Sequence, residues 1–117
     1  MTLPIKPVPC QGGYFVMGDI TGCRDLIPEK YLTTHEYEAE DDPAPVLKNH
    51  LNMPTGTIPL DLAFCRWMAI EKGVCMVPVS VFYEATSPTI MDSYVRLAIC
   101  KDRESLENTI ERLRNAI

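Results

Sequence analysis

The most regular apolar pattern in the chain lies at 93–100, which runs Ser-Tyr-Val-Arg-Leu-Ala-Ile-Cys. Because β-branched and aromatic residues cluster there without Gly or Pro, this stretch predicts a strand. Side chains alternate between the two faces of a strand, so one face is wholly apolar and expected to lie on a core: Val95, Leu97 and Ile99. The other face holds a single fixed cation among mostly apolar neighbours: Tyr94, Arg96, Ala98 and Cys100.

Arg96 stands out in this pattern because a guanidinium among small and apolar side chains is costly to desolvate unless an anion meets it. Its planar fork suits a carboxylate or phosphate held by two parallel hydrogen bonds. Arg96 is therefore either an anion-binding residue or a cation that extends into water from a solvated sheet face. The strand alone leaves both interpretations open.

The rest of the pattern predicts three further strands and two helices. Strands are expected at 3–9, 14–20 and 74–82, and helices at 59–72 and 103–116. Prolines confine the first strand to a sheet edge, and Pro78 requires that its strand ends, bulges or lies at an edge there. A turn at 11–13, which contains two glycines, would join the first two strands as a hairpin.

The first helix has an apolar stripe that is expected to form core rather than a ligand site: Leu60, Ala63, Phe64, Trp67, Met68 and Ile70. Its solvent side is expected to carry Asp61, Arg66, Glu71 and Lys72. Thr57 is the expected N-cap, and Gly73 suits a left-handed stop. Asp102 is expected to cap the last helix, whose apolar stripe is Leu106, Ile110, Leu113 and Ile117.

The order of elements is strand, strand, loop, helix, strand, strand, helix. This order predicts an α+β fold in two layers, with a small mixed or antiparallel sheet covered on one face by the two helices. A long irregular region at 21–57 separates the first hairpin from the first helix and is rich in acidic residues, Pro and Gly. Its length indicates a lid, an insertion or mobility.

Composition adds mainly exclusions. The net charge of −5 argues against nucleic acid and anionic membranes as partners, and no apolar run is long enough for a membrane span. No signal-peptide core is visible near residue 1. The five cysteines are odd in number and lack CxxC spacing, which favours a reducing compartment and hence the cytoplasm. Three of them are expected to be small buried hydrophobes: Cys65, Cys75 and Cys100.

Neither a metal site nor a nucleophilic thiol is favoured. His35 with Glu36 and Glu38 lacks a second spaced pair of ligands, so a solvated loop is the simpler interpretation. A catalytic cysteine would need a histidine base, and both histidines, His35 and His50, fall in the irregular region.

Three segments resemble the C-terminal domain of class I pyridoxal-phosphate aminotransferases. Residues 11–16, Gln-Gly-Gly-Tyr-Phe-Val, resemble the family's P-x-G-x-Y-F entry to that domain. Residues 60–83 resemble its helix, Gly-Val turn and P-x-S-x-F strand, and 92–102 (DSYVRLAICKD) resemble its carboxylate-binding strand. The likeness is greatest for the kynurenine aminotransferase, or glutamine transaminase K, branch. It covers 3–20 and 57–117 in the right order.

The resemblance implies roles for individual residues. Arg96 matches the arginine that holds the substrate's α-carboxylate, and a bidentate grip would orient the substrate over the cofactor. Tyr14 and Phe15 match a segment near the substrate mouth, with ordinary core aromatics of a strand as the alternative. Ser80 and Phe82 match the strand motif and are expected to be structural. No catalytic, cofactor-binding or metal residue is expected within this chain.

The resemblance also implies groups beyond these residues. The family's pyridoxal phosphate is held by a lysine, an aspartate and phosphate-binding groups of a large domain, and no lysine here has the family's Ser-x-x-Lys-like context. We therefore expect 1–117 to be a C-terminal small domain, catalytically incomplete and without cofactor as this chain alone. With a large domain it would transaminate amino acids and 2-oxo acids, or act as a cysteine-S-conjugate β-lyase, in the cytoplasm or in mitochondria.

A non-catalytic interaction or carboxylate-binding module is the alternative from another class. A lone small domain would expose the face that meets the large domain, and apolar surface of that kind recruits a partner or leads to homo-oligomers. Substrate preference and oligomeric state stay open at this point.

Overall fold

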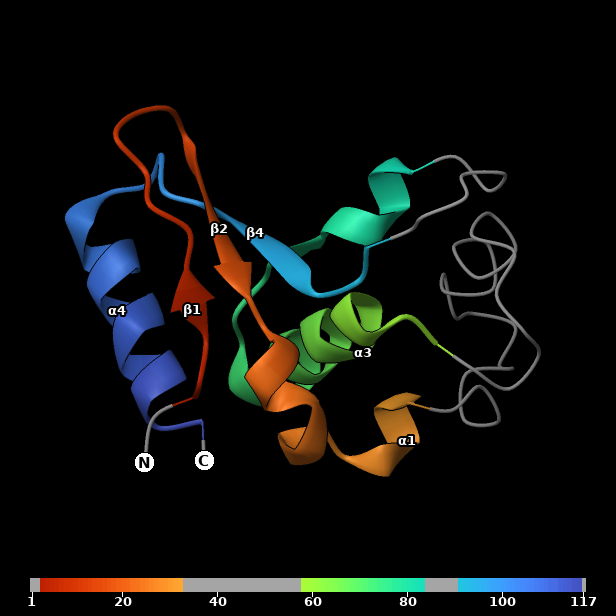
Figure 1. The fold of residues 1–117 in the computed structure, drawn as a ribbon. Coiled ribbons are helices and arrows are strands. Elements are labelled where there is room, and N and C mark those ends of the chain that lie inside the picture. The colour runs from red at the N-terminus through yellow and green to blue at the C-terminus, as the bar shows by residue number, and fades with distance from the viewer. Residues whose placement is uncertain (1–2, 33–57, 84–90, 117) are drawn as a thin grey trace, which may run out of the picture.

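A computed structural model describes residues 3–32, 58–83 and 91–116. Four antiparallel strands form one sheet in the order β1-β2-β4-β3 (Figure 1): β1 (Lys6–Pro7), β2 (Phe15–Asp19), β4 (Tyr94–Ala98) and β3 (Val77–Pro78). The two longest helices, α3 (Leu60–Trp67) and α4 (Arg103–Arg114), lie against the same side of the sheet. The α+β fold in two layers is confirmed, and of the two expected sheet types the antiparallel one is present.

Strand β4 is an inner strand because it pairs with β2 on one side and β3 on the other. Its register places Arg96 opposite Met17 of β2 and Val77 of β3. Val95 is fully buried on the side of the helices. Alternation along the strand therefore puts Arg96 on the sheet face away from the helices.

Helix α3 forms the centre of the core, as its apolar stripe predicts. Phe64 and Met68 are fully buried, and Phe64 meets Trp67 edge to face with ring centroids 6.0 Å apart. The helix widens into a π-helical turn, η3 (Met68–Lys72), and ends at Gly73 with φ of 70°. That left-handed stop is confirmed, since glycine adopts this conformation at little cost.

Two expectations for this helix are wrong. Ile70 is 66% exposed, because the wider π-helical turn rotates it away from the apolar stripe. Asp61, expected on the solvent side, is fully buried. The expected cap Thr57 lies outside the described residues, and instead Oδ2 of Asp92 accepts the Leu60 N–H at 2.9 Å.

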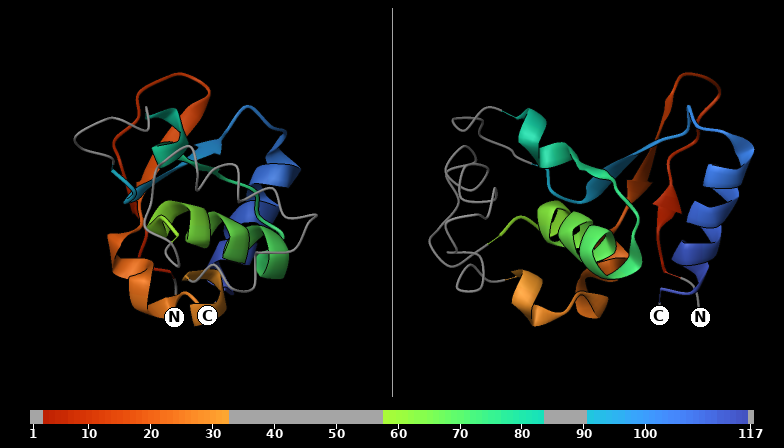
Figure 2. Two further views of the ribbon diagram at one scale, coloured as in Figure 1. Left: turned by 90° about the vertical axis from the view of Figure 1, so that its right-hand side faces the viewer. Right: turned by 180° about the vertical axis from the view of Figure 1, so that it is seen from behind.

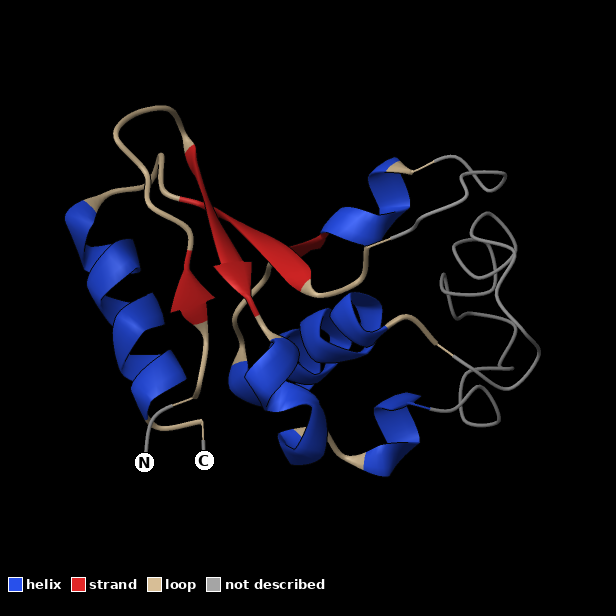
Figure 3. Cartoon of the chain, in the orientation of Figure 1, coloured by secondary structure: helices blue, strands red, loops and turns tan. Residues whose placement is uncertain are grey.

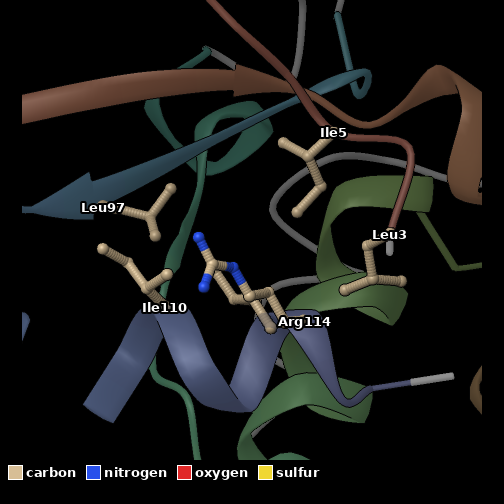
Figure 4. A pocket seen from close by; sticks show the side chains of 6 residues that line it. Leu3, Ile5, Leu97, Ile110 and Arg114 are labelled. Carbon is tan, nitrogen blue, oxygen red and sulfur yellow. The ribbon is translucent and has the colours of Figure 1, made fainter. Parts of the chain in front are cut away.

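Helix α4 begins as predicted, with Oδ1 of Asp102 accepting the Ser105 N–H at 3.0 Å. None of its residues is buried. A cavity of about 200 Å³ separates it from β1 and β4, as Figure 4 shows, lined by Leu3, Ile5, Leu97, Ile110, Leu113 and Arg114. A hydrogen bond of 3.1 Å from Arg112 Nη1 to the Gly73 carbonyl ties α4 to the end of η3.

The region 21–57 is not irregular where the structure describes it. It contains η1 (Thr21–Leu26), a 3₁₀ helix, and α1 (Glu29–Leu32) (Figure 3). Cys23, Ile27 and Tyr31 of this segment are buried in the core. The expectation of irregular chain is therefore wrong for 21–32, and 33–57 lie outside the described residues.

The strand expected at 74–82 is much shorter. Only Val77–Pro78 form β3, which is the sheet edge, and the chain then turns into the 3₁₀ helix η4 (Val79–Phe82). Pro78 ends the strand as expected, since it cannot donate to a further ladder bond. Cys75 and Cys100 are exposed, contrary to expectation, because both lie outside the short strands; Cys65 is buried as expected.

Candidate functional site

The guanidinium of Arg96 lies between two aromatic side chains on the open face of the sheet. Its Cζ atom is 4.1 Å from the centroid of the Phe15 ring and 5.1 Å from that of Phe82. Phe15 comes from the neighbouring strand β2, and Phe82 from η4, which lies on the other side of β4 from α3 (Figure 1, Figure 2). Cation–π attraction therefore helps to hold the guanidinium in place.

One hydrogen-bond donor of Arg96 has no partner within the described residues. Its Nε atom is buried and has no acceptor within the described residues. The two rings accept no conventional hydrogen bond, so they orient the cation without consuming its N–H donors. A buried donor without a partner costs free energy. An anion that binds Nε and one terminal nitrogen together would remove this cost.

The structure brings together two of the three predicted site residues. Phe15 contacts Arg96 through its ring and is 43% exposed. Tyr14 precedes β2, is 69% exposed, and has no ring contact with Arg96 in the described part of the chain. Its carbonyl accepts the Ile99 N–H at 2.8 Å, so its backbone extends the pairing of β2 with β4.

Phe82 is a neighbour of Arg96 that the sequence prediction treated as purely structural. The apolar run at 74–82 predicted a strand that ends, bulges or lies at an edge at Pro78, and a strand that continued to Phe82 would not return this ring to Arg96. The 3₁₀ turn does so, because it folds Phe82 back over β4. Pro78 was the one feature of the sequence that indicated this turn, since a strand that ends at a proline must be followed by a change of direction.

Ser80, at the centre of η4, is fully buried and bonded to a buried carboxylate. Oδ2 of Asp61 accepts the Ser80 N–H at 2.7 Å, and Oδ1 accepts the Ser80 hydroxyl at 2.7 Å and the Leu62 N–H at 2.8 Å. Burial raises the pKa of Asp61 above its ordinary value, although the hydrogen bonds from Ser80 and Leu62 act in the opposite direction. This contact joins the first turn of α3 to the turn that carries Phe82.

Nucleophilic and metal chemistry find little support in the described residues. Burial raises the pKa of the Cys23 thiol to about 11 and also raises the pKa of Cys65, so both stay protonated at neutral pH. Residues 3–32, 58–83 and 91–116 contain no cluster of three His, Cys, Asp or Glu that could hold a metal ion. His35, Glu36 and Glu38 lie outside these ranges.

Pyridoxal phosphate would need a lysine aligned with an acidic group in an enclosed site. Among the described lysines, Lys6, Lys30 and Lys101 are exposed and Lys72 is half-buried at the end of η3. Lys30 lies 3.8 Å from Glu71 in a surface ion pair. The described residues therefore do not fit this cofactor. In the same ranges, no helix is both long and apolar enough to cross a bilayer.

Similarity to curated proteins covers nearly the whole chain. It is 30% identical over 110 residues to kynurenine–oxoglutarate transaminase 1 of Homo sapiens, which is 94% of this chain and 21% of that protein. It is 27% identical over 109 residues to the kynurenine–oxoglutarate transaminase of Dictyostelium discoideum, which is 93% of this chain and 21% of the relative. The chain thus spans about a fifth of the length of the curated relatives it matches. No protein-family model matches it.

Two solved structures share the fold. Bna3p of Saccharomyces cerevisiae, a candidate kynurenine aminotransferase, has a TM-score of 0.64 and 25% identity, covering 97% of this chain and 22% of its own. YbdL of Escherichia coli, described with a methionine aminotransferase function, has a TM-score of 0.54 and 24% identity, covering 96% and 20%. The second likeness is one of fold alone.

Proposed function

Because the chain is homologous to the C-terminal part of the kynurenine aminotransferases and has their fold there, we propose that residues 1–117 are the substrate-binding small domain of a pyridoxal-phosphate aminotransferase. Arg96 binds the carboxylate of an amino acid or 2-oxo acid. Phe15 and Phe82 hold its guanidinium, whereas Tyr14 is left out of the proposed site because it has no ring contact with Arg96 in the described part of the chain.

The observation that carries this proposal is the unsatisfied Nε of Arg96. A buried N–H without an acceptor is rare, and a guanidinium edge with free donors matches the two oxygens of a carboxylate. In the alternative interpretation, the side chain of Arg96 extends into water, and its Nε atom would be solvated instead of buried beside two rings. The structure therefore favours the anion-binding interpretation.

The remaining groups of the reaction belong to a larger domain. The described residues offer no site for pyridoxal phosphate, so this chain contributes binding and orientation of the substrate and is catalytically incomplete alone. The cofactor supplies an electron sink in such enzymes. Amino acids with large neutral, aromatic or sulfur side chains are the proposed substrates, by transamination or by C–S β-elimination. Five free cysteines support a reducing compartment such as the cytoplasm.

The test is a titration of the 117-residue chain with phenylpyruvate, followed by amide and arginine side-chain NMR signals. The wild-type chain is expected to bind in the millimolar range, as one ion pair on an open face allows. Arg96→Ala should abolish binding. Arg96→Lys should weaken it about tenfold or more, because lysine keeps the charge and loses the fork.

Arg103→Ala is the matched control, since it also removes one cation and its side chain is 91% exposed on α4. It should bind phenylpyruvate as the wild type does. Equal losses in Arg96→Ala and Arg103→Ala would show non-specific attraction and contradict the proposal. Unchanged binding in Arg96→Ala would place the carboxylate elsewhere.

A stand-alone interaction module is the second candidate, because Phe15 and Phe82 leave aromatic surface exposed around Arg96. Adding pyridoxal phosphate and an amino acid to the pure chain tests whether the chain is a complete enzyme, which neither candidate function predicts. Schiff-base absorbance with turnover would contradict catalytic incompleteness. Restored turnover when an aminotransferase large domain is supplied would favour the small domain over the module.

A further inference from the structure

Asp61 is an unusual residue for the first turn of a helix because it is fully buried. Its three hydrogen bonds come from Leu62 and Ser80, and no cation pairs with it within the described residues. A buried carboxylate without a counter-charge is costly. Accepting a backbone N–H at the start of a helix needs no such burial, since the exposed Asp102 accepts the Ser105 N–H at the start of α4.

The contact with Ser80 determines where η4 lies. Asp61 holds both the N–H and the hydroxyl of Ser80, at 2.7 Å each. The Ser80 carbonyl in turn accepts the Tyr83 N–H at 3.2 Å, which closes the turn. Phe82 therefore sits on a turn that is fixed at its centre by Asp61.

The Phe82 ring is not held by burial. It is 61% exposed, so packing contributes little to its position. The ring contacts Arg96, whose Cζ atom lies 5.1 Å from the ring centroid. The backbone of η4 is accordingly the main constraint on where the ring lies.

We propose that Asp61 is a positioning residue for the Arg96 site: through Ser80 it fixes the turn that places the Phe82 ring against the Arg96 guanidinium. Its effect on carboxylate affinity rests on the function proposed above, whereas its effect on the geometry of Arg96 does not. The path runs from α3 around the sheet edge at β3 to the opposite face, and it joins the core to the site.

The experiment measures the Arg96 Nε–Hε signal of the ¹⁵N-labelled chain without any ligand, assigned by its loss in Arg96→Lys. Phe82→Leu removes the ring and defines the shift that the ring causes. Asp61→Asn should move the Arg96 signal most of the way to its position in Phe82→Leu. Ser80→Ala should move it in the same direction by less, because the Ser80 N–H bond to Asp61 remains.

Asp102→Asn is the control, since it alters the carboxylate cap of α4, far along the chain from η4, and should leave the Arg96 signal in place. Dispersed amide signals show that each variant is folded; if Asp61→Asn does not fold, Ser80→Ala decides. The proposal would be overturned if Phe82→Leu shifts the Arg96 signal but the folded Asp61→Asn variant, or Ser80→Ala in its place, leaves the signal unmoved.

A second arm repeats the phenylpyruvate titration. Asp61→Asn should weaken binding about 3- to 10-fold, the loss expected when one aromatic support of the cation is misplaced. If the wild-type chain binds no phenylpyruvate, the proposed function fails while the ligand-free signal still decides the role of Asp61. If phenylpyruvate binds and the signal does not move in Asp61→Asn, only the positioning role fails.

Discussion

Helices α3 and α4 cover the same face of one sheet, and they are held to it in opposite ways. Seven of the eight residues of α3 are buried, and its side chains interlock with Val95 of β4. None of the twelve residues of α4 is buried, and a cavity of about 200 Å³ lies beneath it. The first helix is held by extensive packing, whereas the second is held by the half-buried Leu113 and by a hydrogen bond from Arg112 to the Gly73 carbonyl.

This difference bears on the candidate site. Asp61, which fixes η4 and through it Phe82, is part of the tightly packed helix. The ring contacts of Arg96 in the described part of the chain come from β2 and η4, and none comes from α4. Substitutions in α3 should therefore alter both the stability of the fold and the geometry of the Arg96 site, whereas substitutions in α4 should alter the stability alone.

The largest effect is expected from Phe64→Ala in α3. Removing a fully buried ring leaves a cavity in close-packed surroundings, which costs about 3 to 5 kcal/mol. That is a large part of the total stability of a small domain, about 5 to 15 kcal/mol. Urea denaturation followed by circular dichroism measures it. Phe82→Ala is the matched control, and with its ring 61% exposed it should cost about 1 kcal/mol or less. Equal losses would contradict the comparison.

A pair of identical substitutions sharpens the contrast between the helices. Leu62→Ala in α3 removes a side chain that is 4% exposed and should cost about 2 to 5 kcal/mol. Leu113→Ala in α4 removes a half-buried side chain that already borders a cavity, and should cost about 1 kcal/mol. The urea midpoints of the two variants give the comparison directly. A larger loss in Leu113→Ala would mean that α4 is a main part of the core.

The features that the sequence could predict are those that leave a local pattern. The stripe of Phe64, Trp67 and Met68 was predicted because burial on one side of a helix leaves a period of 3.6 residues. Arg96 was singled out as a candidate site residue because strand alternation isolates one cation on its face of the sheet. These signals are local, so a single stretch of chain contains them.

Asp61 and Phe82 could not be assigned in this way. A carboxylate in the first turn of a helix has the same pattern whether water or a serine meets it, and Ser80 lies 19 residues further along the chain. Phe82 reaches Arg96 only because η4 replaces the expected strand. Roles that depend on contacts between distant segments leave no periodic signal in the sequence. Cys75 and Cys100 were wrongly predicted to be buried for a related reason, since the hydrophobic pattern defines the ends of strands poorly.

The smallest effect on the free energy of unfolding is expected from pH. The contributions of Asp102 in α4 and Asp61 in α3 change with pH in opposite directions. Hydrogen bonds from Ser105 hold the pKa of Asp102 below its ordinary value, so this cap stabilises the fold above about pH 4 and the contribution is lost as the pH falls through the lowered value. Burial raises the pKa of Asp61, so its contribution is present below about pH 4 and is lost as the pH rises through the raised value.

Urea midpoints measured from pH 3 to pH 7 for Asp102→Asn and Asp61→Asn, each compared with the wild type, separate the two signs. The stability lost in Asp102→Asn should shrink towards low pH, where the wild-type cap is protonated, and should be small throughout because asparagine also caps helices. The Asp102→Asn variant should retain part of the acid sensitivity of the wild type through Asp19, whose pKa is lowered by hydrogen bonds from Thr21. For Asp61→Asn the loss should instead be greatest at low pH, since protonated Asp61 carries no desolvated charge there. Parallel curves for the two variants would mean that Asp61 is as solvated as Asp102, and the contrast between a packed α3 and an open α4 would then fail at Asp61.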